Sequence, residues 1–103
     1  MLFLNGIFYP GDQMSKGKIL VVDDDAFFRA LCSDILSSGG FFVKTASTGA
    51  EALDLVDNEV FDIVITDLVM PTVSGMDVLE RTKQYNTLTD VIVITGHGSI
   101  ETA

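Results

Sequence analysis

Four short apolar runs, rich in β-branched residues, recur along the chain and alternate with segments of helical periodicity. Runs that are apolar throughout are typical of strands buried on both faces of a parallel sheet. The alternation predicts the order β-α-β-α-β-α-β, and short connections in that order place helices on both faces of the sheet. The four predicted strands are Lys18–Val22, Phe41–Thr45, Phe61–Thr66 and Asp90–Thr95.

The three segments between these runs carry apolar residues at three- to four-residue spacing, which is typical of helices with one buried face. Asp25 is the expected N-cap of the first helix, and Gly39-Gly40 is its expected end. The second helix is expected to begin at Ser47 or Thr48, and the third to cover Met76–Gln84. The apolar residues assigned to the helix faces are Phe27 or Phe28, Leu31, Ile35, Leu36, Ala52, Leu53, Leu55, Val56, Val78 and Leu79.

The composition fits one small domain with a modest core, because the chain has 103 residues of which 48% are hydrophobic. Acidic residues outnumber basic ones by 15 to 6. The resulting net charge of -9 argues against non-specific binding to nucleic acid or to an anionic membrane surface. No apolar run approaches the roughly 18 residues that span a bilayer. The single cysteine, Cys32, excludes an internal disulfide and fits a cytoplasmic location.

The two ends of the chain differ from its middle. Met1-Leu2-Phe3-Leu4 resembles the start of a signal peptide, but it has no basic flank and is followed by the breakers Asn5 and Gly6. We therefore expect residues 1–13 to be an extension outside the fold and residues 14–103 to form the domain. Because an all-apolar parallel strand makes a poor exposed edge, the position of the fourth strand near the C-terminus predicts a domain that is incomplete there.

Two of the predicted strands end in carboxylates: the first runs into Asp23-Asp24-Asp25 and the third into Asp67. If these strands are neighbours, their carboxylates converge at the carboxyl edge of the sheet, where ligands bind in open α/β folds. Crowded carboxylates repel one another, and a hard divalent cation with oxygen ligands relieves the repulsion. Asp25 is better explained as a helix cap than as a ligand. Without Asp67 the acidic run would be explained as a cap with solvated charge.

With these residues in place, the chain resembles the receiver domain of bacterial two-component response regulators over residues 17–103. The resemblance implies a flavodoxin-like doubly wound sheet with strand order 2-1-3-4, from which the fifth strand and the last helix are missing in this chain. The matching residues are Asp23-Asp24, Asp67, Met70-Pro71, Gly75, Thr95 and Gly96.

The resemblance also implies roles for these residues. Asp67 is the expected phosphoacceptor, Thr95 the residue that hydrogen-bonds the phosphoryl oxygens, and Gly96 the small residue that leaves room for them. A sensor histidine kinase is the expected donor, an output domain is expected in a longer parent protein, and a homodimer is a further possibility. The expected Mg²⁺ ligands are Asp24, Asp67, the backbone carbonyl of Val69 and, through water, Asp23.

The chain departs from the family pattern in one respect. Receivers carry a Lys at the end of a fifth strand and a switch aromatic two residues before it, and this sequence ends before either position. Lys83 is not expected to replace that Lys, because it lies on the third predicted helix and is expected to face solvent. His97, the single histidine, lies between two glycines and is expected to be exposed and without a role.

Two other functions compete with phosphoacceptor signalling. A truncated receiver that no longer switches would act only as a dimerisation module, with edge pairing or exchange of elements between chains. A Mg²⁺-dependent phosphohydrolase of the haloacid dehalogenase type would use Asp23 as its nucleophile. However, Asp23-Asp24-Asp25-Ala26-Phe27 lacks the Thr or Val that the motif of that class requires. The chain is also too small for the cap and the second acidic cluster of that class.

Overall fold

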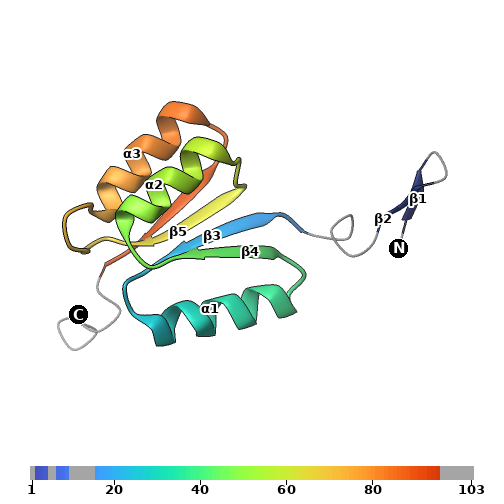
Figure 1. The fold of residues 1–103 in the computed structure, drawn as a ribbon, viewed down its shortest axis with the longest axis horizontal. Helices are drawn as coiled ribbons and strands as arrows, with labels where there is room; N and C mark the ends of the chain where they lie inside the picture. The colour runs from blue at the N-terminus through green and yellow to red at the C-terminus, as the bar shows by residue number, and fades with distance from the viewer. Residues whose placement is uncertain (1, 5–6, 10–15, 96–103) are drawn as a thin grey trace.

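A four-stranded parallel sheet forms the centre of the structure (Figure 1). The computed structural model describes residues 2–4, 7–9 and 16–95. The strands lie in the order β4-β3-β5-β6, which is the predicted order 2-1-3-4. Their bounds are Lys18–Val22 for β3, Phe42–Ala46 for β4, Ile63–Asp67 for β5 and Asp90–Ile94 for β6.

Helices cover both faces of this sheet, as the alternating pattern predicts (Figure 1). Helix α1 (Ala26–Ser38) lies on one face, whereas α2 (Gly49–Asn58) and α3 (Gly75–Tyr85) pack together on the other. The expected caps are present. Asp25 accepts hydrogen bonds from the N–H groups of the first turn of α1, and the Thr48 hydroxyl accepts one from Glu51. No helix in the described part of the chain is long and apolar enough to cross a membrane.

The main core lies between the sheet and the α2/α3 pair. Val78 of α3 is fully buried, and Ala52 and Val56 of α2 are buried with it, as their helical spacing predicts. Alternate residues of β3 and β5 face this layer because successive side chains of a strand point to opposite faces. The buried residues of this core are Leu20, Val22, Ala46, Ala52, Val56, Phe61, Val64, Met70 and Val78.

The opposite face is covered less completely, and the expected apolar stripe on α1 is buried only in part, with Phe28 and Leu36 half-buried. No residue of α1 is fully buried, and the side chain of Phe27 is 76% exposed. Leu31 and Ile35 are exposed as well. The physical reason is the position of α1, which packs mainly over β4 and β3. In the described part of the chain, no second helix lies beside α1 to bury its outer flank.

An unexpected hairpin occurs in the N-terminal segment. Strands β1 (Leu2–Leu4) and β2 (Ile7–Tyr9) pair antiparallel with each other and form a sheet separate from the four-stranded one. The dipeptide Asn-Gly between two apolar runs is the strongest short-range hairpin signal in a sequence. In the sequence analysis this dipeptide is interpreted only as a break in a signal-like run, and the strand pairing is therefore not predicted there.

The loop from β5 to α3 brings the start of α3 against the end of β5. The Gly75 N–H donates to the carbonyl oxygen of Leu68 at 2.9 Å. A Cβ at Gly75 would lie 2.2 Å from the carbonyl oxygen of Asp67 and 2.8 Å from the Cα of Leu68. Both are backbone atoms that cannot move aside without displacing the strand end. Glycine at this position is therefore a condition for the close approach of α3 to the end of β5.

The same loop contains a strained residue. Thr72 has a φ of 67°, and it is the single non-glycine residue with positive φ among the residues that the structure describes. A β-branched side chain disfavours this left-handed region. Contacts on both sides of Thr72 fix this conformation of the loop. The Val73 N–H donates to the Pro71 carbonyl at 2.7 Å, and the side chain of Met70 is buried in the core.

The first prediction concerns Gly75. Gly75→Ala should lower the free energy of unfolding by about 1–3 kcal/mol, because the added methyl group overlaps backbone atoms. Gly39→Ala is the matched control, since its Cβ would lie 3.4 Å from the nearest heavy atom and its φ of -79° suits any residue. Urea titration followed by circular dichroism measures both. Equal stability of the two variants would contradict the close approach of α3 to β5.

The second prediction concerns Thr72. Thr72→Asn should raise the free energy of unfolding by about 0.5–1 kcal/mol, because asparagine tolerates positive φ better than threonine does. Thr87→Asn, in the exposed turn before β6, is the control and should change stability by less. Thermal melts of the two variants measure the change in stability that each substitution causes. A lower melting temperature for Thr72→Asn would show that the hydroxyl or methyl group of Thr72 makes a compensating contact.

Candidate metal and phosphoryl site

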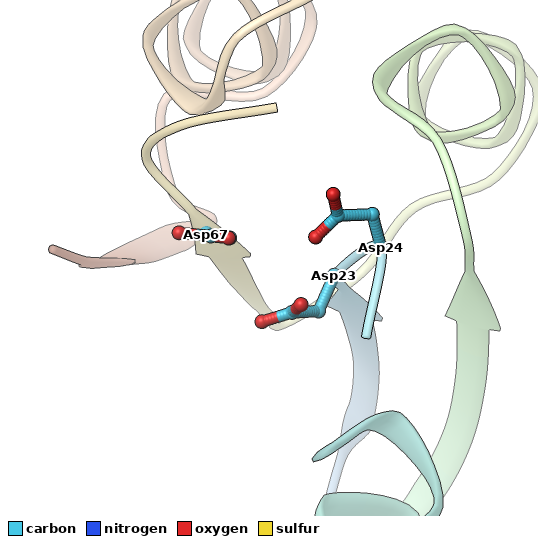
Figure 2. Close-up of side chains that lie close together, drawn as sticks. All are labelled: Asp23, Asp24 and Asp67. Carbon is cyan, nitrogen blue, oxygen red and sulfur yellow. The ribbon is translucent and has the colours of Figure 1, made fainter. Parts of the chain in front are cut away.

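Adjacent parallel strands carry the predicted carboxylates to one edge of the sheet (Figure 2). In the register of β3 and β5, Val22 lies opposite Thr66, so that Asp23 and Asp67 each follow a paired residue. Asp24 is the next residue after Asp23 and turns away from the strand. The structure thus brings together the three acidic side chains that the sequence placed at separate strand ends.

The three carboxylates form a compact cluster. One oxygen from each of Asp23, Asp24 and Asp67 can be chosen so that all three atoms lie within 4.8 Å of one another. Asp23 is 0% exposed and Asp67 is 6% exposed, whereas Asp24 is open to solvent. Two buried carboxylates beside a third are unfavourable as a set of anions, and an ion that enters from the side of Asp24 would offset the repulsion.

Backbone groups hold the two buried carboxylates in place. The Asp25 N–H donates to Asp23 Oδ1 at 2.8 Å, which couples this carboxylate to the cap of α1. The Val69 N–H points to Asp67 Oδ1 at the longer distance of 3.4 Å. The Leu68 N–H donates to the Ile94 carbonyl at 2.8 Å and so extends the pairing of β5 and β6 past Asp67. The end of β5 is therefore fixed by the sheet.

A residue that the sequence reasoning missed also holds this edge. The guanidinium of Arg29, on the first turns of α1, donates from Nη1 to the carbonyl oxygen of Asp23 at 2.7 Å. The Asp23 N–H donates in turn to the carbonyl of Ala46 on β4. Arg29 therefore supports the turn that carries Asp23 and Asp24. The available signal was a basic residue about one helical turn after the end of the acidic run.

The other described cations with printed contacts lie elsewhere. Lys18 and Lys44 both bind Glu59, and their hydrogen bonds lower the pKa of this carboxyl. Arg81 pairs with Asp57. The expectation that Lys83 faces solvent is wrong, because its Nζ donates to the backbone carbonyls of Thr87 and Thr89.

The negative field of the cluster reaches one neighbouring group. Burial, and to a lesser extent the charge of Asp23, raise the pKa of the Cys32 thiol. Cys32 is half-buried on α1, in agreement with its predicted role as a small apolar residue without an activating basic neighbour.

The remaining predicted site residues are placed only in part. Thr95 directly follows β6 and is exposed, one position beyond Ile94, which pairs with Asp67. Val69 lies two residues after Asp67, with an exposed side chain. Gly96 and His97 lie outside the described residues. The register thus puts Thr95 at the same edge of the sheet as the carboxylates, while its role stays a prediction.

The donor set fits a hard divalent cation. Three carboxylates at one sheet edge offer oxygen atoms only, which are the ligands that Mg²⁺ takes from proteins, and Mg²⁺ commonly keeps several waters. The exposed Asp24 leaves one side of the cluster accessible to such an ion and its waters. Asp23, Asp24 and Asp67 would hold the ion.

Comparison with known proteins identifies the family to which this chain is similar. Residues 19–103 match the family model described as the response regulator receiver domain. The chain is 33% identical over 88 residues to sporulation initiation phosphotransferase F of Bacillus subtilis (strain 168), covering 85% of this chain and 71% of that protein. It is 38% identical over 89 residues to the probable transcriptional regulator ycf27 of Guillardia theta, covering 86% of this chain but 35% of that protein.

A solved structure gives the same result. The response regulator protein TrrA of Thermotoga maritima, crystallised in complex with Mg²⁺-BeF, superposes with a TM-score of 0.72 at 33% identity. The match covers 79% of this chain and 70% of that one. These relatives lend no support to the phosphohydrolase alternative or to a function limited to dimerisation. With its fold, its acidic edge and its relatives in agreement, the chain belongs to the response regulator receiver domains, the signalling modules of two-component systems.

Proposed function

We propose that Asp67 accepts a phosphoryl group from a sensor histidine kinase. The observation that carries this proposal is the arrangement of the cluster, in which Asp67 ends a central strand with oxygens of Asp23 and Asp24 within 4.8 Å. Asp67 is held by the sheet on its backbone side, and its carboxylate faces the two other carboxylates in Figure 2. A carboxylate that is fixed in this way is suited to attack phosphorus.

The proposed step conserves atoms and charge. A carboxylate oxygen of Asp67 forms a bond to phosphorus as the bond from phosphorus to the histidine nitrogen of the kinase breaks. The product is an acyl phosphate on Asp67, and the nitrogen keeps the electron pair of the broken bond. Bound Mg²⁺ would supply positive charge that neutralises the phosphoryl oxygens. The chain's own contribution is positioning, which is the main requirement of phosphoryl transfer.

Each neighbouring residue has a proposed part. Asp24 and Asp67 would bind Mg²⁺ directly with the backbone carbonyl of Val69, and Asp23 would act through water. Thr95 would donate its hydroxyl hydrogen to a phosphoryl oxygen, and Gly96 would leave space for the group. The position of Thr95 next to Ile94, the partner of Asp67 in the register, supports its part. In this scheme the chain acts as a phosphoacceptor in signalling and does not turn over a substrate as an enzyme.

The partners follow from the same scheme. The chain spans 35% of the length of its Guillardia theta relative and 20% of another, the transcriptional regulatory protein ZraR of Klebsiella oxytoca. We therefore propose that this receiver controls an output domain in a longer parent protein, with transcription as the regulated process. The histidine kinase and this response are proposed to act in the cytoplasm. Direct contact of this domain with nucleic acid is not part of the proposal, since its net charge is -9.

The third prediction tests the acceptor. Incubation with acetyl phosphate and Mg²⁺ should add one phosphoryl group, detected by intact-mass spectrometry, and Asp67→Asn should abolish the addition because the amide cannot form the acyl phosphate. Asp34→Asn, which removes a carboxylate from the exposed surface of α1, should leave it unchanged. Phosphorylation of Asp67→Asn at the rate of the unchanged chain would refute the assignment.

The fourth prediction tests the metal site through stability. At a Mg²⁺ concentration ten times the dissociation constant, the free energy of unfolding should rise by about 1.4 kcal/mol, because the ion binds the folded chain. For a domain of this size the melting temperature should rise by about 5–10 °C. Asp67→Asn should abolish most of this rise and should melt higher than the unchanged chain without metal, because one repelling charge is gone.

Asp34→Asn is again the matched control, since it removes the same charge away from the cluster. It should keep the full response to Mg²⁺. A chain whose melting temperature is unchanged by Mg²⁺ at tens of millimolar, while Ca²⁺ and Mn²⁺ are also without effect, would show that the three carboxylates do not form a cation site.

A further inference from the structure

The turn between β3 and α1 carries two of the three carboxylates of the cluster, and three hydrogen bonds hold it. The Asp23 N–H donates to the carbonyl of Ala46 on β4 at 3.2 Å, and the Asp25 N–H donates to Asp23 Oδ1 at 2.8 Å. The Asp23 carbonyl accepts the third hydrogen bond, from Nη1 of Arg29 at 2.7 Å. Of these three contacts, only the last can be removed by a substitution that leaves the backbone and the carboxylates intact.

Asp24 depends on this backbone more than the other two carboxylates do. Its side chain is exposed and accepts no hydrogen bond from another described residue. Asp23 and Asp67 are buried, and each accepts a hydrogen bond from a backbone N–H. Because a peptide unit is planar, the carbonyl of Asp23 and the Cα of Asp24 move together. Arg29 therefore helps to fix the position from which the Asp24 carboxylate starts.

The guanidinium of Arg29 binds this carbonyl although a carboxylate lies nearer in the sequence. Asp25 precedes Arg29 by four residues, a spacing at which acidic and basic side chains commonly pair on a helix. Asp25 instead caps α1, and Arg29 forms no ion pair with another described residue. Hydrogen bonds with an ionised donor are about twice as strong as neutral ones, so the contact to the Asp23 carbonyl is a strong one.

Packing around Arg29 is loose, so its side chain can be replaced without opening the main core. Arg29 is half-buried beside a cavity of about 330 Å³ between α1 and β4. No large apolar side chain lines this cavity, and its other lining residues are Ala26, Ala30, Ser33, Asp34 and Thr45. The hydrogen bond to Asp23 is therefore the contact that orients the guanidinium.

We infer that Arg29 is a positioning residue that sets the affinity of the cluster for Mg²⁺, an inference that rests on the proposed metal site. By holding the Asp23 carbonyl, Arg29 keeps the Asp24 carboxylate where it binds the same ion as Asp67. Arg29 itself needs no contact with the ion or with a phosphoryl group. Residues that hold metal ligands in place in this way commonly change metal affinity by about 10- to 100-fold when they are replaced.

The charge of Arg29 and its hydrogen bond act on metal binding in opposite directions. A positive charge near the cluster repels a divalent cation, so loss of the charge alone would tighten binding. Loss of the hydrogen bond would release the peptide between Asp23 and Asp24 and weaken binding. Water and salt screen a charge that is only half-buried, so we expect the effect of the hydrogen bond to be the larger one. The sign of the change in affinity therefore distinguishes positioning from simple electrostatics.

Titration of the whole chain with Mn²⁺ is the test and is the fifth prediction. The electron paramagnetic resonance signal of free Mn²⁺ reports binding, and this ion accepts the same oxygen ligands as Mg²⁺. Arg29→Met removes the donor and the charge and should weaken Mn²⁺ binding about tenfold. Arg29→Lys keeps a charge and a donor and should bind within about threefold of the unchanged chain. Arg29→Gln is too short to reach the carbonyl and should bind as weakly as Arg29→Met, which keeps the test valid if the methionine variant does not fold.

Arg81→Met is the matched control, because it makes the same substitution on α3. Arg81 pairs with Asp57 at the surface, away from the acidic edge. Its replacement should leave Mn²⁺ affinity within about twofold of the original value. Urea titration without metal separates positioning from a general loss of stability. The two methionine variants should unfold at similar urea concentrations, since each loses the contacts of one partly exposed guanidinium, while only Arg29→Met loses metal affinity.

Four outcomes would overturn the inference. Arg29→Met could bind Mn²⁺ as the unchanged chain does, or more tightly, in which case the charge of Arg29 outweighs positioning. Equal weakening by Arg29→Met and Arg81→Met would assign the effect to lost stability. A chain that binds Mn²⁺ in none of its forms would refute the proposed metal site together with the inference. The titration contains no phosphoryl donor, so a failure of Asp67 to accept a phosphoryl group leaves its result unchanged and is detected separately by intact mass.

Discussion

Parallel pairing of β3 with β5 is the interaction on which the site depends. The two strands are separated in sequence by α1, β4 and α2, and their register places Val22 opposite Thr66. A slip by one residue would move every side chain of β3 to the other face of the sheet and would move Asp23 out of line with Asp67. Once the register is fixed, the carboxylates at the ends of the two strands lie close together.

Repulsion between these close carboxylates destabilises the folded chain, and contacts in the surrounding structure compensate for it. Asp23 and Asp67 are buried beside each other and close to Asp24, whereas most described cations bind carboxylates or carbonyls elsewhere. The compensation comes from the sheet, from the α1 cap and from the Arg29 contact to the Asp23 carbonyl. The strained Thr72 lies in the loop after Asp67, and Gly75 begins α3 at the end of this loop. Strain concentrated next to a charged cluster is typical of a functional site.

Much of this structure could be predicted from the sequence because the signals are local. The apolar runs and the caps Asp25 and Thr48 report directly on strands and helix starts, with ends that shift by one or two residues. The strand order and the convergence of Asp23, Asp24 and Asp67 needed the additional step that strands one and three are neighbours. That step came from the flavodoxin-like order, and the structure confirms it.

Features that depend on tertiary contacts were not predictable in this way. The exposure of Phe27 follows from the packing of α1 mainly over β4 and β3, and the contact of Arg29 with Asp23 depends on the turn between them. Lys83 carries no signal in the sequence that would direct it to the carbonyls of the α3–β6 loop. The hairpin is a different case, because the signal Asn-Gly was present and was given another meaning.

Mapping the phosphorylated residue is the most direct test of the central claim that the β3–β5 pairing creates a phosphoacceptor at Asp67. An acyl phosphate formed with a phosphoryl donor and Mg²⁺ can be reduced with borohydride, which converts the modified aspartate to homoserine. Peptide mass spectrometry then locates the change. The account predicts homoserine at position 67 alone, in amounts that depend on Mg²⁺. Homoserine at position 23 or 24, or an equal yield at 67 in the presence of a chelator, would contradict it.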